Sequence, residues 1–236
     1  MRLATVDGIE LSFKGDQLDQ GELDVWETVL HAVRTQDLGS ECRLTSYALL
    51  QLMGLTDAGP NMKTLEERIA RLVGCTVTLR QGRYRYIGHL ICSAATDTAT
   101  KQWVISIDPN MRPLFEADQF TQIDWAVRRK LARKPLAQWL HGFYSSHAKP
   151  YPVKAATLLR LAGSSDKSRD SALQTLRKAL DSVEAAHMQL EADRIGDVVP
   201  ACGFAYKIVG DLVHVDRKPS VAQRRHLAKR RLAGAK

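Results

Sequence analysis

The sequence predicts an α+β fold made of two tandem winged-helix domains, and three observations support this prediction. Apolar residues recur at helical spacing in two separate groups of three segments. Each group is followed by short alternating segments around a glycine turn, a pattern typical of a β-hairpin. Three helices followed by a hairpin is the element order of a winged helix, whose third helix enters the major groove while the hairpin contacts the DNA backbone.

The first group begins after a short predicted strand at residues 5–13. Asp19 and Glu22 have the spacing of a capping box, and the apolar residues that follow predict a helix over residues 20–35. A second, shorter helix is predicted after Thr45. The third begins near Pro60, a favoured first-turn residue, and ends at Gly74. Residues 75–79, 84–92 and 103–107 then read as strands, with a turn at residues 80–83.

The second group repeats this order. Residues 124–147 are predicted as helical with an interruption at Pro135, followed by a short helix at 153–161 and a long helix at 166–187. A hairpin over residues 204–215 turns at Gly210 and Asp211. We therefore predict an N-terminal winged-helix domain at residues 1–112, a C-terminal one at 113–216 and a basic tail at 217–236.

Charge is distributed unevenly along the 236 residues, which carry a formal net charge of +8. Residues 1–118 hold 12 Lys and Arg against 16 Asp and Glu, whereas residues 119–236 hold 22 against 10. The last 20 residues hold eight basic side chains and no acidic one. This pattern favours a polyanionic partner bound mainly by the second half, the alternative being a solvated basic surface. No apolar run is long enough to span a bilayer and no export signal is recognisable, so we expect a cytoplasmic protein without a membrane partner.

No catalytic or metal-binding motif is found. The four cysteines are scattered, without the closely spaced pairs of a structural zinc site. The sequence contains no G-x-G-x-x-G, G-x-S-x-G or H-E-x-x-H motif. We therefore expect a protein that is not an enzyme and that needs no cofactor.

The candidate DNA-binding residues lie on the predicted third helices and hairpins. Helical projection places polar side chains opposite the apolar stripe of each helix, and Gln and Lys can pair with base edges while Ser and Thr reach bases or phosphates. In the first domain the candidates are Lys63, Thr64 and Arg71 on the helix, beside Glu67, and Arg80, Arg83 and Arg85 on the hairpin. In the second they are Lys167, Ser168, Ser171, Gln174, Thr175, Arg177 and Lys178 on the helix, and Lys207, beside His214, on the hairpin.

Two further basic groups have a more open interpretation. The cluster Arg128, Arg129, Lys130, Arg133 and Lys134 is either a phosphate-binding surface or a solvated helix face. The tail group Arg224, Arg225, Lys229, Arg230 and Arg231 is typical of a segment that follows a nucleic-acid backbone and becomes ordered on its partner.

Two stretches resemble a known family. Residues 17–26 (QLDQGELDVW) and 134–147 (KPLAQWLHGFYSSH) are similar to motifs of the TrfA plasmid replication initiators, and the likeness extends from about residue 5 to residue 216. The resemblance implies a protein that binds iterons, the direct repeats of a double-stranded plasmid origin, with tandem winged helices. It also implies opening of adjacent A·T-rich DNA, with single-stranded DNA as a further ligand, recruitment of a host initiator and helicase, and a monomer–dimer equilibrium. Longer members carry a Leu-Phe element for the sliding clamp, of which residues 10–13 are at best a degenerate copy.

Three alternative functions differ from that of a replication initiator in ways that can be tested. A winged-helix transcriptional repressor would use the same DNA chemistry and differs in that it opens no A·T-rich segment. An origin-nicking enzyme needs a tyrosine nucleophile beside a His-x-His metal site, and that arrangement is absent from the sequence. A protein-interaction module with a basic tail is the remaining alternative.

Overall fold

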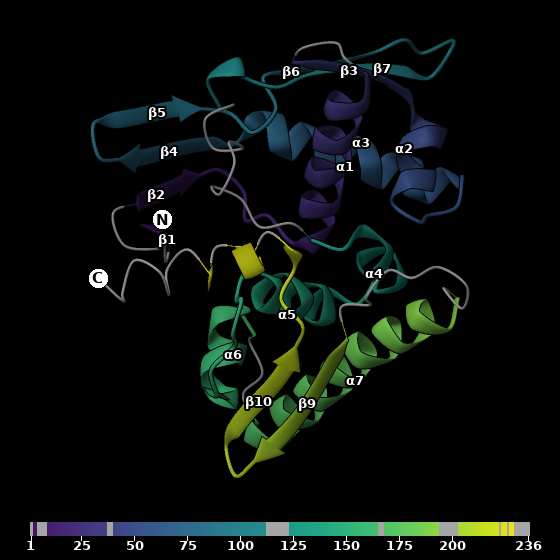
Figure 1. Ribbon diagram of the computed structural model, residues 1–236. Coiled ribbons are helices and arrows are strands. Elements are labelled where there is room, and N and C mark those ends of the chain that lie inside the picture. Colours follow the sequence, from purple (N-terminus) through teal and green to yellow (C-terminus); the bar gives the residue numbers. More distant parts are fainter. Residues whose placement is uncertain are drawn as a thin grey trace. The chain divides into compact units, whose positions relative to one another are not determined.

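The computed structural model divides the chain into two compact units, Met1–Phe120 and Thr121–Lys236. It describes residues 2–3, 9–36, 40–111, 123–164, 168–193, 203–221, 223–225 and 227–228. The ribbon in Figure 1 labels the elements, and each unit is taken separately below.

The first unit combines three helices with seven strands among its described residues. In chain order these are β1 (Arg2–Leu3), β2 (Ile9–Lys14), α1 (Gln20–Gln36), β3 (Glu41–Thr45), α2 (Ser46–Leu52), α3 (Gly59–Gly74), β4 (Thr76–Gln81), β5 (Tyr84–Gly88), β6 (Ser93–Thr96) and β7 (Gln102–Ser106). The three predicted helices are confirmed, with Thr45 accepting the capping hydrogen bond from the Ala48 amide at 3.1 Å.

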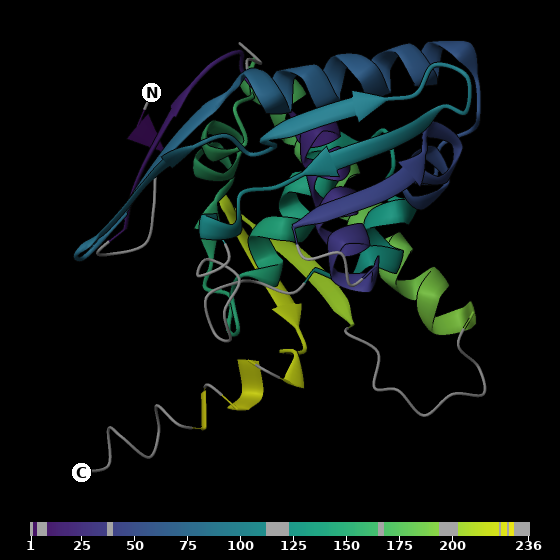
Figure 2. The same ribbon diagram turned by 90° about the horizontal axis from the view of Figure 1, so that it is seen from above.

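A three-stranded antiparallel sheet of order β3-β7-β6 packs against the helices of this unit. Seen from above in Figure 2, its strands lie over α1. Leu44 pairs with Trp103, and the Trp103 indole Nε1 donates to Ser46 Oγ at 2.9 Å, which ties β7 to the start of α2. Val25, Leu49, Leu65 and Ile105 are among the side chains buried beneath the sheet. Strands β3 and β6 were not predicted from the sequence.

A second sheet, of order β1-β2-β4-β5, changes the predicted role of the first hairpin. The residues expected to form the hairpin of the domain, β4 and β5, pair with the N-terminal strand β2 instead of with β3. The strands that pair with β3 come later in the chain, at β6 and β7. Figures 1 and 2 show β4 and β5 projecting away from the helices.

The second unit contains four helices and three strands among its described residues. They are α4 (Trp125–Lys130), α5 (Pro135–Ser145), β8 (Val153–Lys154), α6 (Ala155–Leu161), α7 (Arg169–Asp193), β9 (Phe204–Val209) and β10 (Leu212–Arg217). The predicted interruption at Pro135 is confirmed, because α4 ends before Arg133, whose φ is 64°, and Pro135 begins α5. The hairpin turns at Gly210, whose φ of 62° favours glycine.

The second unit has the same sheet order as the first: β8, the strand before α6, pairs with β10, which pairs with β9. Its core lies between α5, α7 and the hairpin, where Leu140, Leu158, Leu176, Leu180 and Val213 are fully buried. Both units therefore place a strand directly before the next-to-last helix (α2 or α6) and pair it with the last strand of a hairpin that follows the last helix (α3 or α7). No helix in the part of the chain that the structure describes is long and apolar enough to cross a membrane.

The motif at residues 17–26 has a structural explanation. The Asp19 amide donates to Glu22 Oε2 at 2.7 Å and the Gly21 amide donates to Asp19 Oδ1, so that both ends of the capping box are satisfied. At Gly21 the Arg68 guanidinium occupies the space that a Cβ would fill, so a larger residue at this position would displace the arginine. Glu22 is fully buried and receives Arg71 Nη2 at 2.6 Å and Arg68 Nε at 3.9 Å. These residues attach α3 to the beginning of α1.

Candidate nucleic-acid interface

The exposed face of α7 carries most of the candidates of the second unit. Ala172, Leu176, Ala179 and Val183 bury one side of this helix. The opposite side exposes the described candidates of the helix, namely Ser171, Gln174, Thr175, Arg177 and Lys178, and Ser168 is exposed directly before the helix begins. Within the described residues, no hydrogen bond or ion pair joins the six side chains to other parts of the protein. Lys167 lies outside the described residues.

Five of these six side chains lie on the N-terminal half of α7, and the sixth, Ser168, directly precedes the helix. In helix-turn-helix proteins this is the part of the recognition helix that contacts base edges. Gln174 can donate to and accept from adenine, and Lys178 can donate to guanine. The positive end of the helix dipole at this terminus also favours phosphate.

The hairpin of the second unit is attached to the same helix. Tyr206 of β9 donates to Asp181 Oδ1 at 2.5 Å, and burial together with this carboxylate raises the pKa of the Tyr206 phenol to about 12. Lys207 is the exposed neighbour of Tyr206 and lies opposite His214. Because the phenol stays protonated, it keeps the hairpin strand hydrogen-bonded to α7, and Lys207 is held on the outer side.

The candidates on α3 of the first unit are bound to their own chain. Lys63, with a side chain 80% exposed, lies 4.0 Å from Glu67. Thr64 donates its hydroxyl to the Pro60 carbonyl at 2.9 Å. Arg71 is half-buried and pairs with Glu22. A base or phosphate would have to compete with each of these partners. Helix α3 therefore offers DNA fewer unengaged side-chain donors and acceptors than α7 does.

The three arginines predicted on the first hairpin are exposed, but they belong to the outer sheet. Arg80 of β4 lies directly opposite Arg85 of β5 and also opposite Glu10 of β2, while Arg83 lies in the turn. They share no sheet with β3 and β7. Their contact with DNA stays a prediction.

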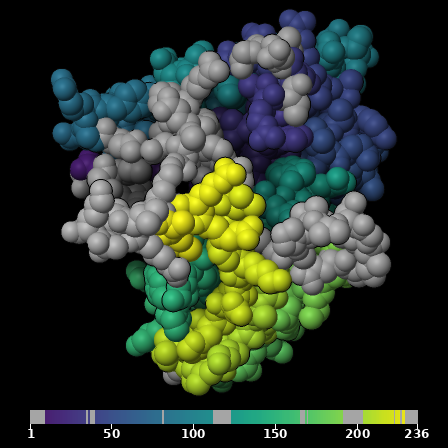
Figure 3. Space-filling view, in the orientation of Figure 1, coloured from purple at the N-terminus to yellow at the C-terminus, as the bar shows by residue number. Residues whose placement is uncertain are grey.

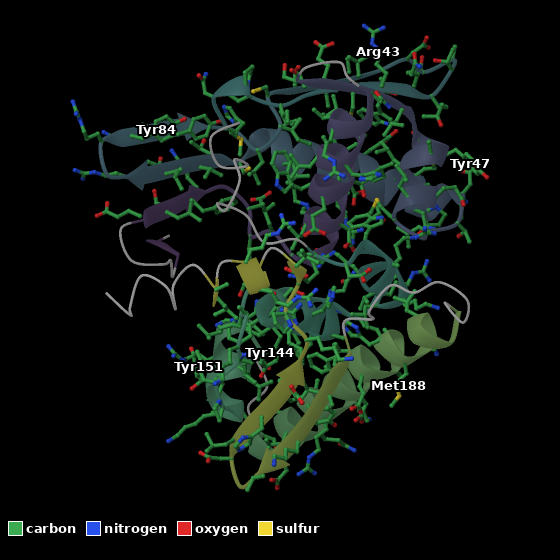
Figure 4. The ribbon with its side chains drawn as sticks, in the orientation of Figure 1. Arg43, Tyr47, Tyr84, Tyr144, Tyr151 and Met188 are labelled. Carbon is green, nitrogen blue, oxygen red and sulfur yellow. The ribbon has the colours of Figure 1, made fainter. Side chains whose placement is uncertain are left out.

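The strands β3 and β6, which were not predicted from the sequence, bring three further exposed residues to attention. Arg43 lies on β3 and Tyr47 in the first turn of α2, and both point outward in Figure 4. Lys101 is exposed in the turn between β6 and β7 with φ of 56°, and its carbonyl accepts from the Ser46 amide at 3.0 Å. The true hairpin of the first unit therefore meets the start of α2. Thr45, recognisable as a cap, is the only sequence signal near this surface.

The basic cluster before Pro135 divides into two kinds of residue. Arg129, Lys130, Arg133 and Lys134 are exposed, whereas Arg128 is buried with 2% exposure. Arg128 therefore does not belong to a solvated face. In the same unit, burial lowers the pKa of His141 to about 3, with the neighbouring His187 and Arg128 adding to the effect.

The described residues hold no group of three or more His, Cys, Asp or Glu side chains that could bind a metal ion. What the surface offers is cations, amides and hydroxyls arranged along a helix, which is chemistry suited to recognising DNA.

The chain is similar in sequence to proteins that are named for plasmid replication. A plasmid replication initiator protein TrfA of Escherichia coli is 30% identical over 168 residues, covering 68% of this chain and 41% of that protein. A RepFIB replication protein A of Escherichia coli is 25% identical over 195 residues, covering 78% of this chain and 59% of that protein. The chain thus spans between two fifths and three fifths of these relatives.

Two solved structures share the fold. Domains 2 and 3 of RctB superpose with TM-scores of 0.58 and 0.52 at 11% and 12% identity. The first covers 92% of this chain and 89% of the other, and the second covers 95% and 93%.

The family model described as TrfA protein matches residues 3–184, which include both motifs recognised in the sequence. The match extends from β1 into α7 and so includes the exposed face of the long helix. The chain is therefore a member of the TrfA family of plasmid replication initiators.

Proposed function

We propose that this protein initiates plasmid replication by binding iterons of the origin with two winged-helix domains and by opening the adjacent A·T-rich DNA. The observation that carries the proposal is the exposed face at the start of α7, where Ser168 and five polar side chains of the helix lie opposite a buried side that is mainly apolar. The names of the relatives support the step to replication.

The winged-helix interpretation is supported by the sheet order common to both units. In each unit the strand directly before the next-to-last helix pairs with the second strand of the closing hairpin. The last helix, α3 or α7, is exposed along one side and contacts the first strand of that hairpin. In this proposal α7 and α3 are the reading helices, β9–β10 and β6–β7 are the wings, and Lys101 replaces Arg83 at the wing tip of the first unit.

The remaining expectations form part of the same proposal. The protein acts by binding and deforming DNA, without catalysis or a cofactor. It recruits a host initiator and helicase, with the sliding clamp as a further partner, and it exchanges between monomer and dimer. Two helices reading successive major-groove faces would need a site of about two helical turns.

The test is fluorescence anisotropy with a duplex from the plasmid's own repeats and a scrambled duplex, each at two salt concentrations. We expect the repeat to bind about 10³-fold or more tightly than the scrambled duplex. Equal binding to both duplexes would disprove iteron recognition. A single-strand-specific chemical probe then separates the initiator from a repressor, because only an initiator makes the A·T-rich segment reactive.

A further inference from the structure

The chain beyond β10 is attached to the second unit, although the sequence predicted a tail that becomes ordered only on a partner. Arg217, the last residue of β10, donates through Nη1 to the carbonyls of Tyr144 at 3.1 Å and of Ser145 and His147 at 3.2 Å. These carbonyls lie at the C-terminal end of α5 and directly after it, where backbone oxygens have no following helical turn to donate to them. The Tyr144 carbonyl also accepts from the His147 amide at 3.1 Å. A cation at this end is also favoured by the helix dipole.

Gln223 forms a second attachment to the same helix end. Its Nε2 donates to the Ser145 carbonyl at 2.8 Å, and its Oε1 accepts from Arg217 Nη1 at 3.2 Å. The two side chains therefore share one carbonyl and also contact each other. The segment is held at the end of α5 by Arg217 Nη1, whose two N–H groups are shared among the three carbonyls and Gln223 Oε1, and by Gln223 Nε2, which donates to the Ser145 carbonyl.

The segment then begins a helical turn with its own cap. The Ser220 amide donates to Gln223 Oε1 at 3.0 Å and the Gln223 amide donates to Ser220 Oγ at 3.2 Å, which is a complete capping box. The Arg224 amide donates to the Ser220 carbonyl at 2.9 Å, and the described residues at 221, 223–225 and 227–228 have helical backbone. We call residues 217–228 the C-terminal arm. Figure 3 shows its described part on the surface, continuous with β10.

The C-terminal arm presents positive charge from a fixed position. Arg224 and Arg225 are exposed, while Gln223 beside them is partly buried in the attachment. No acidic residue occurs anywhere from residue 217 to 236. Arginine guanidinium groups match phosphate oxygens in bidentate geometry, and a pre-positioned group loses less entropy on binding than a flexible one. The attached helix α5 in turn packs against α7.

We propose that the C-terminal arm of the second unit binds the DNA backbone. Arg224 and Arg225 contact phosphates, and the attachment of Arg217 and Gln223 to α5 holds these two arginines in place. The proposal rests on the proposed function in so far as DNA is the partner. It adds that phosphate contact depends on the position of the arm and not only on its charge.

The experiment measures anisotropy of the full chain with the scrambled and the repeat duplex from 50 to 300 mM salt. Arg224→Gln with Arg225→Gln removes the two charges, and Gln223→Ala weakens the attachment without changing any charge. The control is Lys14→Gln with Arg34→Gln, which removes two exposed charges from the first unit. Each phosphate contact contributes about 0.9 to the slope of log affinity against log salt.

We expect the arginine double variant to lower that slope by about 2 and to weaken binding roughly ten- to sixty-fold at 0.1 M salt, equally on both duplexes. Gln223→Ala should weaken binding to both duplexes several-fold. The melting temperature of this protein variant should stay within a few degrees of that of the unmodified chain. The control variant should change the slope much less.

Three results would overturn the proposal. An unchanged slope in the arginine variant would show that the arm does not contact DNA. Full affinity in Gln223→Ala, together with a loss in the arginine variant, would show that charge acts without the attachment. No DNA binding by the unmodified chain would remove both proposals. Equal binding of the two duplexes would refute iteron recognition alone, because the arm is tested on the scrambled duplex as well.

Discussion

The two units share the order of one three-stranded sheet, β3-β7-β6 in the first and β8-β10-β9 in the second, yet their last helices, α3 and α7, use polar side chains differently. On α3, Lys63, Thr64 and Arg71 each contact a partner within the first unit. On α7, and at Ser168 directly before it, the six described candidates contact none of the described residues through side-chain hydrogen bonds or ion pairs. A shared scaffold therefore does not imply a shared binding capacity, because internal ion pairs can occupy the same positions that recognise DNA elsewhere.

The largest expected effect tests the internal ion pairs of the first unit. Glu22→Gln leaves Arg68 and Arg71 without their buried carboxylate, and we expect a loss of about 3 kcal/mol in the free energy of unfolding of this unit. Hydrogen exchange followed residue by residue should show faster opening in the first unit only. The matched control, Glu67→Gln, breaks an exposed pair with Lys63 and should cost less than about 0.5 kcal/mol. Equal effects of the two variants would contradict a structural role of Glu22.

The second effect distinguishes the units by pH. His141 is buried and keeps a pKa of about 3 in the fold, whereas the unfolded chain binds a proton near the ordinary value of 6.5. The unfolded state therefore binds more protons between pH 6.5 and 3, and stability must fall as the pH is lowered through this range. We expect the second unit to lose about 2 kcal/mol between pH 6.5 and 5.

His31 and His89 of the first unit are exposed, so its stability should change less over this range. Urea unfolding monitored by unit-resolved hydrogen exchange at both pH values provides the measurement. A steeper decline in the first unit would refute the assignment, and replacing His141 with Gln should flatten the pH dependence of the second.

The third effect compares the two reading faces directly. Gln174→Ala should weaken binding to the repeat duplex by about 1–2 kcal/mol and relax the preference at one base pair. Lys63→Ala should change affinity less, because Glu67 already pairs with this lysine. Anisotropy on matched and single-mismatch duplexes measures both. A larger loss in Lys63→Ala would make the first unit the principal reader.

The smallest effect concerns the helix that precedes each reading helix. Thr45 caps α2 through its hydroxyl, whereas Lys154, at the same position before α6, makes no side-chain cap. Thr45→Ala should lower the free energy of unfolding of the first unit by about 1 kcal/mol. Lys154→Ala should change that of the second by less than about 0.5 kcal/mol. Thermal unfolding of the two variants measures this difference. An equal loss in the free energy of unfolding would contradict the prediction.

Local signals were sufficient for the helices and for the hairpin of the second unit. The capping residues Asp19 and Thr45, the first-turn prolines Pro60 and Pro135 and the turn glycine Gly210 act within a few residues of their own position, so their effect can be read from the sequence. The exposed face of α7 also followed from periodicity, because a strongly apolar stripe determines which side is left for solvent.

Strand pairing and partners distant in the sequence were decided only by the tertiary structure. Nothing near residues 76–88 indicates that β4 pairs with β2, or that β3 pairs with β7 instead. Each pairing joins residues some sixty positions apart in the sequence. Arg71 and Arg128 looked exposed by spacing, but Glu22 and the core of the second unit bury them wholly or partly. The tail looked unattached because its partners are carbonyl oxygens, which every residue carries and which only folding makes available at the end of α5.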